Sequence, residues 1–406
     1  MRSLHRASVA LSIPLVSACL VATPSAVAAG ATAAPGAVSA VPPREPVGGP
    51  QLGGRGVIVN AGPGVPAAPK IKAASWLIAD GDTGEVLAAR DPHGHYLPAS
   101  TLKTLTTVAL IPKLDPNRMV RPSQAACDVE GTKVGMTPKL TYKVSDLFYA
   151  LMMMSANDAA VTLAEANGGM RKTLADMNAE ARRLNAHDTV AGSPNGLDVD
   201  LGLNVKTQHT SAYDLALILR EGLRNPQFRG YVQKIDHWFP APPSKKEKKK
   251  GKKTGGYPIH THNRMLEGQA HAYRGMLGGK NGFTLAAQQT YVAAARRGDK
   301  TIIISLMKAD RPPSPYAAKL LDWGFAAVGK AKPVGTLVPP GDLKPAAKPD
   351  QDGNPLLPRA IAGDEERRDW VTIGVVVGGV GILAGVLALV MRRRREGDDA
   401  EPSGGE

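Results

Sequence analysis

The sequence predicts an α+β domain in which one antiparallel sheet is assembled from distant parts of the chain. Two strand-like segments occupy residues 73–90, and two more occupy residues 289–309 around the turn "RRGDK". Several helical patterns lie between these pairs, and another follows at residues 314–328. Strands at both ends with helices between them are typical of a sheet flanked by helices.

The first strand pair is indicated by apolar residues on either side of a turn. Trp76, Leu77 and Ile78 precede "DGDTG", and Val86 and Leu87 follow it. Gly and Asp are the residues that favour tight turns, so we expect two strands joined at this point.

The helices are indicated by apolar residues at helical spacing. Residues 100–110 show this pattern, and Pro98 just before them suits a helix start. Residues 143–169 predict a helix, a turn near Ser155 and a second helix, and residues 211–223 predict another helix.

Both ends of the chain carry membrane signals. Residues 1–29 are typical of a secretory signal peptide, with Arg2 and Arg6 ahead of an apolar run and small residues at the end. Residues 371–391 are 21 uncharged residues, which suffice to cross a bilayer core. Four arginines follow at 392–395 and favour a cytoplasmic tail, 392–406, by the positive-inside rule.

These signals divide the chain into segments. We expect a linker rich in Pro, Ala and Gly at 30–70, one compact domain at 71–332, a stalk at 333–369 and a transmembrane helix at 370–391. The domain would then face the cell wall from the outer side of the cell membrane, on a single-pass anchor. "LVSAC", which ends at Cys19, also resembles a lipoprotein acceptor box, an alternative anchor.

The charge of the chain limits the binding partners to be expected, and its cysteine content limits the disulfides. The net charge is +14, and residues 245–253 hold seven lysines and one glutamate within a Lys-rich insertion, 244–256, that we expect to be solvated and disordered. An exported chain is not expected to bind nucleic acid. Lys245–Lys253 would attract anionic wall polymers or lipid head groups, or would only solubilise the chain. Cys127 is the single cysteine after the signal, so no internal disulfide forms.

The start of the helix at 100–110 holds a candidate nucleophile and base. Ser100 and Lys103 are three residues apart and so share one helix face. A serine hydroxyl needs a base, and a lysine with a lowered pKa can accept its proton. Alone, the pair is better explained by a capping serine and a surface lysine.

Two further motifs favour catalysis. "SAN" occupies residues 155–157, and "KNG" occupies 280–282 ahead of "FT". The order S-x-x-K, S-x-N, K-x-G is the signature of penicillin-binding proteins and serine β-lactamases. In an exported chain, this ordered set predicts an acyl-transfer site without a metal or cofactor.

The resemblance extends over residues 74–328. "IADGDTGEVLAARDPHGHYLPASTLKTLT", "SPNGLDVD" with "HTSAYDLALIL", and "HNRML" with "GMLGGKNGFT" resemble segments of the D-alanyl-D-alanine carboxypeptidases of the S11 peptidase family. The resemblance implies the serine β-lactamase/DD-peptidase-like fold. It also implies removal of the terminal D-alanine from peptidoglycan stem pentapeptides, with β-lactams as covalent inhibitors.

The resemblance also assigns roles to residues. Ser100 would attack the scissile carbonyl, Lys103 would be the base and Ser155 would relay a proton to the leaving amine. The backbone N–H groups of Ser100 and Phe283 would form the oxyanion hole. The remaining residues that the resemblance implies in substrate binding are Asn157, Lys280, Asn281, Phe283 and Thr284.

One departure from the family pattern concerns the third motif. The family usually has threonine where this chain has Asn281, which changes carboxylate placement although an amide also donates hydrogen bonds. "SPNGLDVDLG" supplies Asp198 and Asp200 but no glutamate of the kind that deacylates a β-lactamase. A membrane-anchored β-lactamase and a catalytically weak wall-binding protein remain the alternatives.

Overall fold

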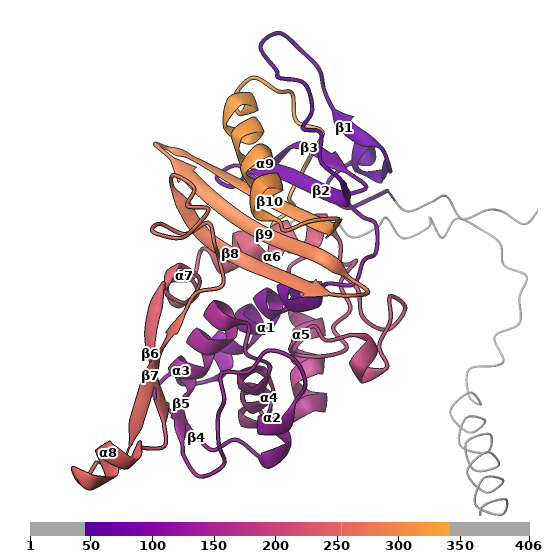
Figure 1. The fold of residues 1–406 in the computed structure, drawn as a ribbon. Coiled ribbons are helices and arrows are strands. Elements are labelled where there is room, and N and C mark those ends of the chain that lie inside the picture. The colour runs from indigo at the N-terminus through magenta and orange to yellow at the C-terminus, as the bar shows by residue number, and fades with distance from the viewer. Residues whose placement is uncertain (1–44, 253, 342–406) are drawn as a thin grey trace, which may run out of the picture. The chain divides into compact units, whose positions relative to one another are not determined.

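The computed structural model describes residues 45–252 and 254–341 and has the predicted α+β architecture (Figure 1). The strands of its main sheet come from both ends of the described chain, and most of the helices lie between them in sequence. The predicted signal peptide, transmembrane helix and cytoplasmic tail lie outside the described residues. Within the described residues, no helix is long and apolar enough to cross a membrane.

The main sheet has seven strands, all paired antiparallel. Six follow the order β1-β3-β2-β10-β9-β8, and β11 also pairs with β3. Their bounds are Val57–Val59 (β1), Ala73–Asp80 (β2), Glu85–Arg90 (β3), Met276–Thr284 (β8), Gln288–Arg297 (β9), Lys300–Ala309 (β10) and Gly335–Thr336 (β11). Two small hairpins stand apart, formed by Met119–Val120 (β4) with Tyr142–Lys143 (β5) and by Asp236–Ala241 (β6) with Gly255–His260 (β7).

Helices cover both faces of the sheet. One face carries α9, Ser314–Ala327, and the other carries the larger helical group that includes α1 and α6 (Figure 1). The α-helices of that group are Lys103–Leu110 (α1), Gln124–Asp128 (α2), Val144–Tyr149 (α3), Asn157–Ala166 (α4), Met170–Arg183 (α5), Ala212–Gly222 (α6) and Pro226–Gln233 (α7). A short helix, α8 (Lys245–Lys249), ends the β6–β7 hairpin.

Short helical segments complete the described part of the chain. The 3₁₀ helices are Pro50–Gly53 (η1), Ala99–Leu102 (η2), Ile111–Lys113 (η3) and Val199–Leu201 (η5), and a π-helical segment, η4, spans Ala150–Met154.

The two cores follow from the alternation of side chains along a strand. Leu77 and Ala79 of β2 join the core under α1 and α6, whereas Trp76 and Ile78 join the core under α9. Strands buried on both faces read as continuous apolar runs, which is why β2, β9 and β10 were recognisable from sequence.

The predicted elements are largely confirmed. The strand pairs at 73–90 and 289–309 are β2–β3 and β9–β10. The helix predicted at 211–223 is α6, whose capping serine, Ser211, accepts a hydrogen bond from the backbone N–H of Asp214. The helix–turn–helix around Ser155 is also present.

The predicted linker and stalk boundaries are wrong in part. Residues 50–53 form η1 and residues 57–59 form β1, although 30–70 was predicted to be a linker. Similarly, β11 pairs with β3 inside the predicted stalk, and Leu337 is fully buried. Both segments have weak patterns of their own and are ordered by the edge of β3, which supplies their hydrogen-bond partners.

The Lys-rich insertion is partly structured rather than wholly disordered. Ser244 caps α8 by accepting from the backbone N–H of Glu247, and the Glu247 carboxylate accepts from the backbone N–H of Ser244. This reciprocal capping box satisfies two otherwise unpaired backbone donors. The lysines of the hairpin tip remain largely exposed, as predicted.

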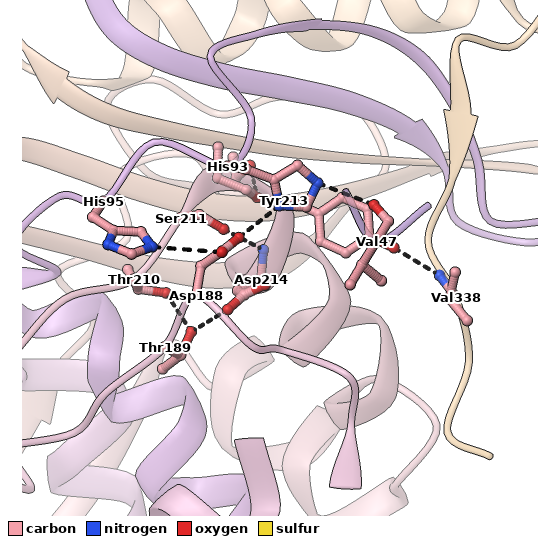
Figure 2. Close-up of polar contacts among 12 residues, drawn as sticks. Val47, His93, His95, Asp188, Thr189, Thr210, Ser211, Tyr213, Asp214 and Val338 are labelled. Carbon is pink, nitrogen blue, oxygen red and sulfur yellow. Dashed lines mark hydrogen bonds and ion pairs between the residues drawn. The ribbon is translucent and has the colours of Figure 1, made fainter. Parts of the chain in front are cut away.

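A polar cluster fastens the N-terminal segment to the domain. Figure 2 shows His93 between Asp188 and Val47: its Nδ1 lies 2.6 Å from the Asp188 carboxylate and its Nε2 lies 3.0 Å from the Val47 carbonyl. Burial acts to raise the pKa of Asp188, but the hydrogen bond and charge of His93 lower it overall. Tyr213, in the same cluster, accepts from the backbone N–H of Val338 and so holds the C-terminal side as well.

Candidate active site

The candidate nucleophile stands where η2 runs into α1. Ser100 lies in the first turn, and Ala99 before it has φ 47°, in the left-handed region that residues with a Cβ rarely adopt. Such backbone conformations persist where surrounding contacts enforce them, and they gather at functional sites. The neighbouring Thr290 contributes one such contact, because its hydroxyl donates to the Pro98 carbonyl at 2.9 Å.

Lys103 is completely buried and surrounded by hydrogen-bond partners. Its Nζ lies 3.0 Å from Ser100 Oγ, 2.8 Å from Asn157 Oδ1 and 2.5 Å from the Asn195 carbonyl oxygen. The two carbonyl oxygens only accept hydrogen bonds. A neutral amine has two N–H groups for them and one lone pair left for the serine hydroxyl, which is the arrangement a general base requires.

Electrostatics favour that neutral form. Burial lowers the pKa of Lys103 well below its usual value, and the positive charge of Lys280 lowers it further. Burial also lowers the pKa of Lys280, to about 7. Two buried ammonium groups near each other are unfavourable, so near neutral pH the two lysines together carry less than two positive charges.

Ser155 is held in place by its backbone. It ends η4 with φ 66° and ψ 30°, a left-handed conformation, and it is 8% exposed. Among the described residues, its buried Oγ has no hydrogen-bond partner. A buried hydroxyl without a partner is unfavourable, so this side chain is poised for a group that arrives with the substrate.

Asn157 is oriented by a second contact. Its Nδ2 donates to the Glu130 carbonyl at 2.7 Å, which turns its Oδ1 toward Lys103. The predicted substrate-binding amide therefore also positions the base.

The third motif lies on β8, at the edge of the sheet, beside η2. A Cβ built on Gly282 would lie 2.6 Å from the backbone nitrogen of Ser100, so the two segments are in close backbone contact. Lys280 is 1% exposed, and its Nζ donates to the Asn281 carbonyl at 2.6 Å. Positions 281–283 of β8 therefore pass along the nucleophile.

The other predicted binding residues, Asn281, Phe283 and Thr284, lie in three different environments. Asn281 lines an open pocket of about 370 Å³ together with His262, Tyr291 and other residues. Phe283 is 55% exposed. Thr284 is engaged within the protein, because its hydroxyl donates to the Asp198 carboxylate at 2.6 Å.

Sequence reasoning missed two contributors in the loop "SPNGLD". Asn195 supplies the carbonyl that meets Lys103, and a Cβ on Gly196 would lie 1.8 Å from the Ala99 carbonyl oxygen. Gly196 also has φ +81°, so glycine is needed there for both conformation and space. The turn-like "NG" dipeptide was the available signal, but nothing in it indicates contact with residue 99.

Comparison with known proteins identifies the family. The family model described as D-alanyl-D-alanine carboxypeptidase, Peptidase S11, matches residues 63–311. A D-alanyl-D-alanine carboxypeptidase of Mycobacterium tuberculosis, DacB2, is 36% identical over 274 residues, which cover 66% of this chain and 87% of that protein. The carboxypeptidase DacD of Escherichia coli is 29% identical, and the match covers 64% of each chain.

Solved structures give the same result for the fold. A D-alanyl-D-alanine carboxypeptidase of Mycobacterium tuberculosis superimposes with a TM-score of 0.61 at 34% identity, covering 69% of this chain and 99% of that one. The DD-transpeptidase of Streptomyces K15 shares the fold at 24% identity, with a TM-score of 0.57 over 64% of this chain and all of that one. Since the family model matches more than half of the sequence, this chain belongs to the D-alanyl-D-alanine carboxypeptidase family, the S11 serine peptidases.

Proposed function

We propose that this chain is a serine-type D-alanyl-D-alanine carboxypeptidase that removes the terminal D-alanine from peptidoglycan stem pentapeptides. The observation that carries the proposal is the contact of a buried Lys103 amine with Ser100 Oγ at 3.0 Å, while both other Nζ contacts are carbonyl oxygens. The relatives named above supply the substrate class.

Acylation begins with proton transfer. The neutral Lys103 amine takes the Ser100 proton as Oγ bonds to the carbonyl carbon of the penultimate D-alanine. The carbonyl π electrons move to the oxygen, which then carries a negative charge. The backbone N–H groups of Ser100 and Phe283 are the proposed donors to this oxyanion.

The tetrahedral intermediate then expels D-alanine. The electron pair returns to the carbonyl, the C–N bond breaks, and the leaving nitrogen takes a proton through the Ser155 hydroxyl, which Lys103 resupplies. A water molecule adds to the ester carbonyl, with its proton accepted by the lysine. Collapse breaks the bond between the carbonyl carbon and Ser100 Oγ, Lys103 returns the proton to that oxygen, and the shortened peptide is released.

The substrate carboxylate meets the third motif. Lys280 supplies positive charge, and Asn281 supplies an amide N–H in place of the threonine hydroxyl that the family pattern implies. Asn157 holds the substrate backbone as well as Lys103. Recognition of the carboxylate therefore depends on β8, whereas the nucleophile and its base lie on η2 and α1.

Stereospecific release of alanine tests the proposal. A peptide that ends in D-Ala–D-Ala should release D-alanine, whereas the same peptide ending in D-Ala–L-Ala should not react. Equal release from both peptides, or from neither, would contradict the assigned activity.

A β-lactamase is the rival reading of the same motifs. No carboxylate of the described residues is hydrogen-bonded to Ser100 or Lys103, and Asp198 is engaged by Thr284. We therefore expect penicillin to acylate Ser100 and the resulting acyl-enzyme to hydrolyse slowly. Rapid, repeated turnover of nitrocefin would favour the β-lactamase instead.

Location at the membrane is proposed from sequence. The apolar run 371–391 followed by arginines at 392–395 supports a single-pass anchor with the domain on the wall side. A protease applied to intact cells should leave a C-terminal tag uncut and should cleave one placed in the domain. The exposed lysines of the β6–β7 tip support contact with anionic wall polymers, measurable as salt-sensitive sedimentation with purified walls.

A further inference from the structure

A second cavity lies at the opposite edge of the main sheet from the candidate active site. It measures about 630 Å³ and is formed where β1, the start of β2, the end of β3 and the start of α9 meet. The active-site strand β8 forms one end of the strand order, and β1 forms the other. The cavity is therefore separate from the nucleophile.

The cavity is lined by cations from four separate parts of the chain. They are Lys70 and Lys72 before β2, Arg90 at the end of β3, Arg311 after β10 and Lys319 on α9. Because these residues are distant in sequence, the fold gathers their charge, unlike the continuous lysine run of the β6–β7 tip.

The floor of the cavity is apolar and fixed. Trp76 is 1% exposed, and the buried side chains of Ile71 and Tyr316 lie beside it. The guanidinium of Arg311 lies 5.9 Å from the centre of the Tyr316 ring. Cations around an apolar floor fit a ligand with both anionic groups and a carbon backbone.

Acidic side chains neutralise little of this charge. Among the described residues, none lines the cavity. The neighbouring Asp310 carboxylate lies 3.5 Å from Arg311 Nε and accepts from the Tyr316 hydroxyl at 2.8 Å. Within the described residues, the other four lining cations have no ion-pair partner. Like charges held together without counter-charges are unfavourable unless an anion binds them.

The turn before α9 joins this cavity to the pocket beside Asn281. Arg311 lines the basic cavity, while Pro312, Pro313 and Ser314 line the pocket at the third motif. A polymer bound in the basic cavity would therefore lie one short turn from the pocket that Asn281 lines, while the nucleophile itself lies toward the other edge of the sheet.

We propose that the basic cavity is a binding site for a phosphodiester-linked anionic polymer, which would hold the domain on phosphate-bearing wall material. Lys70, Lys72 and Lys319 would meet the phosphates, and the apolar floor would meet the carbon backbone between them. This binding does not depend on the acyl-transfer chemistry proposed above.

Titration of the full chain with a short glycerol-phosphate oligomer tests the site, by calorimetry at about 0.15 M salt, where exposed charges are screened beyond roughly 8 Å. The double variant Lys70→Gln with Lys319→Gln should bind roughly ten- to thirtyfold more weakly, since two cations near a polyanion are lost. A matched control, Lys139→Gln with Lys300→Gln, removes the same charge from exposed lysines outside the cavity and should bind within about twofold of the parent.

Three results would overturn the proposal. Equal weakening in both double variants would show attraction by net charge alone. Equal binding of a polyglutamate of matched charge would show that the cavity does not prefer phosphate over carboxylate groups. Binding to vesicles containing phosphatidylglycerol but not to the oligomer would assign the cavity to lipid head groups rather than to a polymer. D-alanine release from a free peptide should be unchanged in both variants.

Discussion

Replacing Gly282 with alanine would place a methyl group against the backbone that carries the nucleophile. The added Cβ would lie 2.6 Å from the Ser100 nitrogen and 2.9 Å from the Thr101 nitrogen. Ordinary contacts begin near 3.4 Å, so β8 and η2 must separate by about 0.8 Å. Both neighbours on the η2 side are backbone atoms and cannot turn aside as a side chain would.

The expected loss follows from this displacement. A shift of about 1 Å in reacting groups costs roughly 10²-fold in rate. The Ser100 N–H is also a proposed oxyanion donor, and removal of one such donor costs about 10²–10³-fold. We therefore expect Gly282→Ala to lower kcat/KM for D-alanine release by about 10²-fold, or about 2.7 kcal/mol.

The assay is the second-order rate of labelling by a fluorescent penicillin, measured together with D-alanine release. Gly230→Ala is the matched control, because Gly230 lies within α7 and an added Cβ meets nothing within 4 Å. It should leave both rates within about twofold and should not destabilise the helix, since alanine has the higher helix propensity. A folded Gly282→Ala protein that reacts within threefold of the parent would refute the close-contact reasoning.

The remaining predictions concern the lysine pair and the relay serine. Lys103→Arg should lower the rate of acylation by about 10²–10⁴-fold, because a guanidinium cannot act as a base. Lys280→Arg should lose less of this rate and should move the alkaline limb of kcat/KM above its parental position near pH 7. Equal losses of rate in the two variants would remove the distinction between base and carboxylate partner. Ser155→Ala should slow both D-alanine release and penicillin labelling, and unchanged rates would exclude a relay through its hydroxyl. Burial lowers the folded-state pKa of Lys280 to about 7, so the unfolded chain binds more protons than the folded chain between pH 7 and 10. The unfolding free energy should therefore rise with pH in this range by up to about 1.4 kcal/mol per pH unit. Lys280→Met should flatten this slope in denaturant titrations, and an unchanged slope would contradict the burial effect.

The elements predicted from sequence are those whose own pattern determines their structure. β2, β9 and β10 are buried on both faces and carry continuous apolar runs, and α6 has both periodicity and a capping serine. β1 and β11 span only three and two residues, which are too few to show such a pattern clearly. They are strands because the β3 edge offers hydrogen bonds, which is a tertiary effect that local sequence does not encode.

The candidate site likewise contains contacts that the sequence indicates and contacts that it does not. The contact between Ser100 and Lys103 is present as predicted. The hydrogen bond between Lys103 and Asn157 was not predicted, because Asn157 was expected only to hold the substrate. Asn195 contributes a backbone carbonyl, and any residue type carries one, so its identity gives no signal. That Thr284 binds substrate stays a prediction. Its hydroxyl donates to Asp198, 86 residues away in sequence, and local sequence does not indicate that contact.

The most direct test of the account is to find where penicillin attaches and whether the same residue releases D-alanine. Intact mass and peptide mapping after treatment with benzylpenicillin should show one adduct, on the peptide that contains Ser100. Ser100→Ala should lose both the adduct and the release of D-alanine while it melts like the parent. An adduct that maps to another residue, or labelling that persists in Ser100→Ala, would contradict the assignment of Ser100 as the nucleophile and of Lys103 as its base.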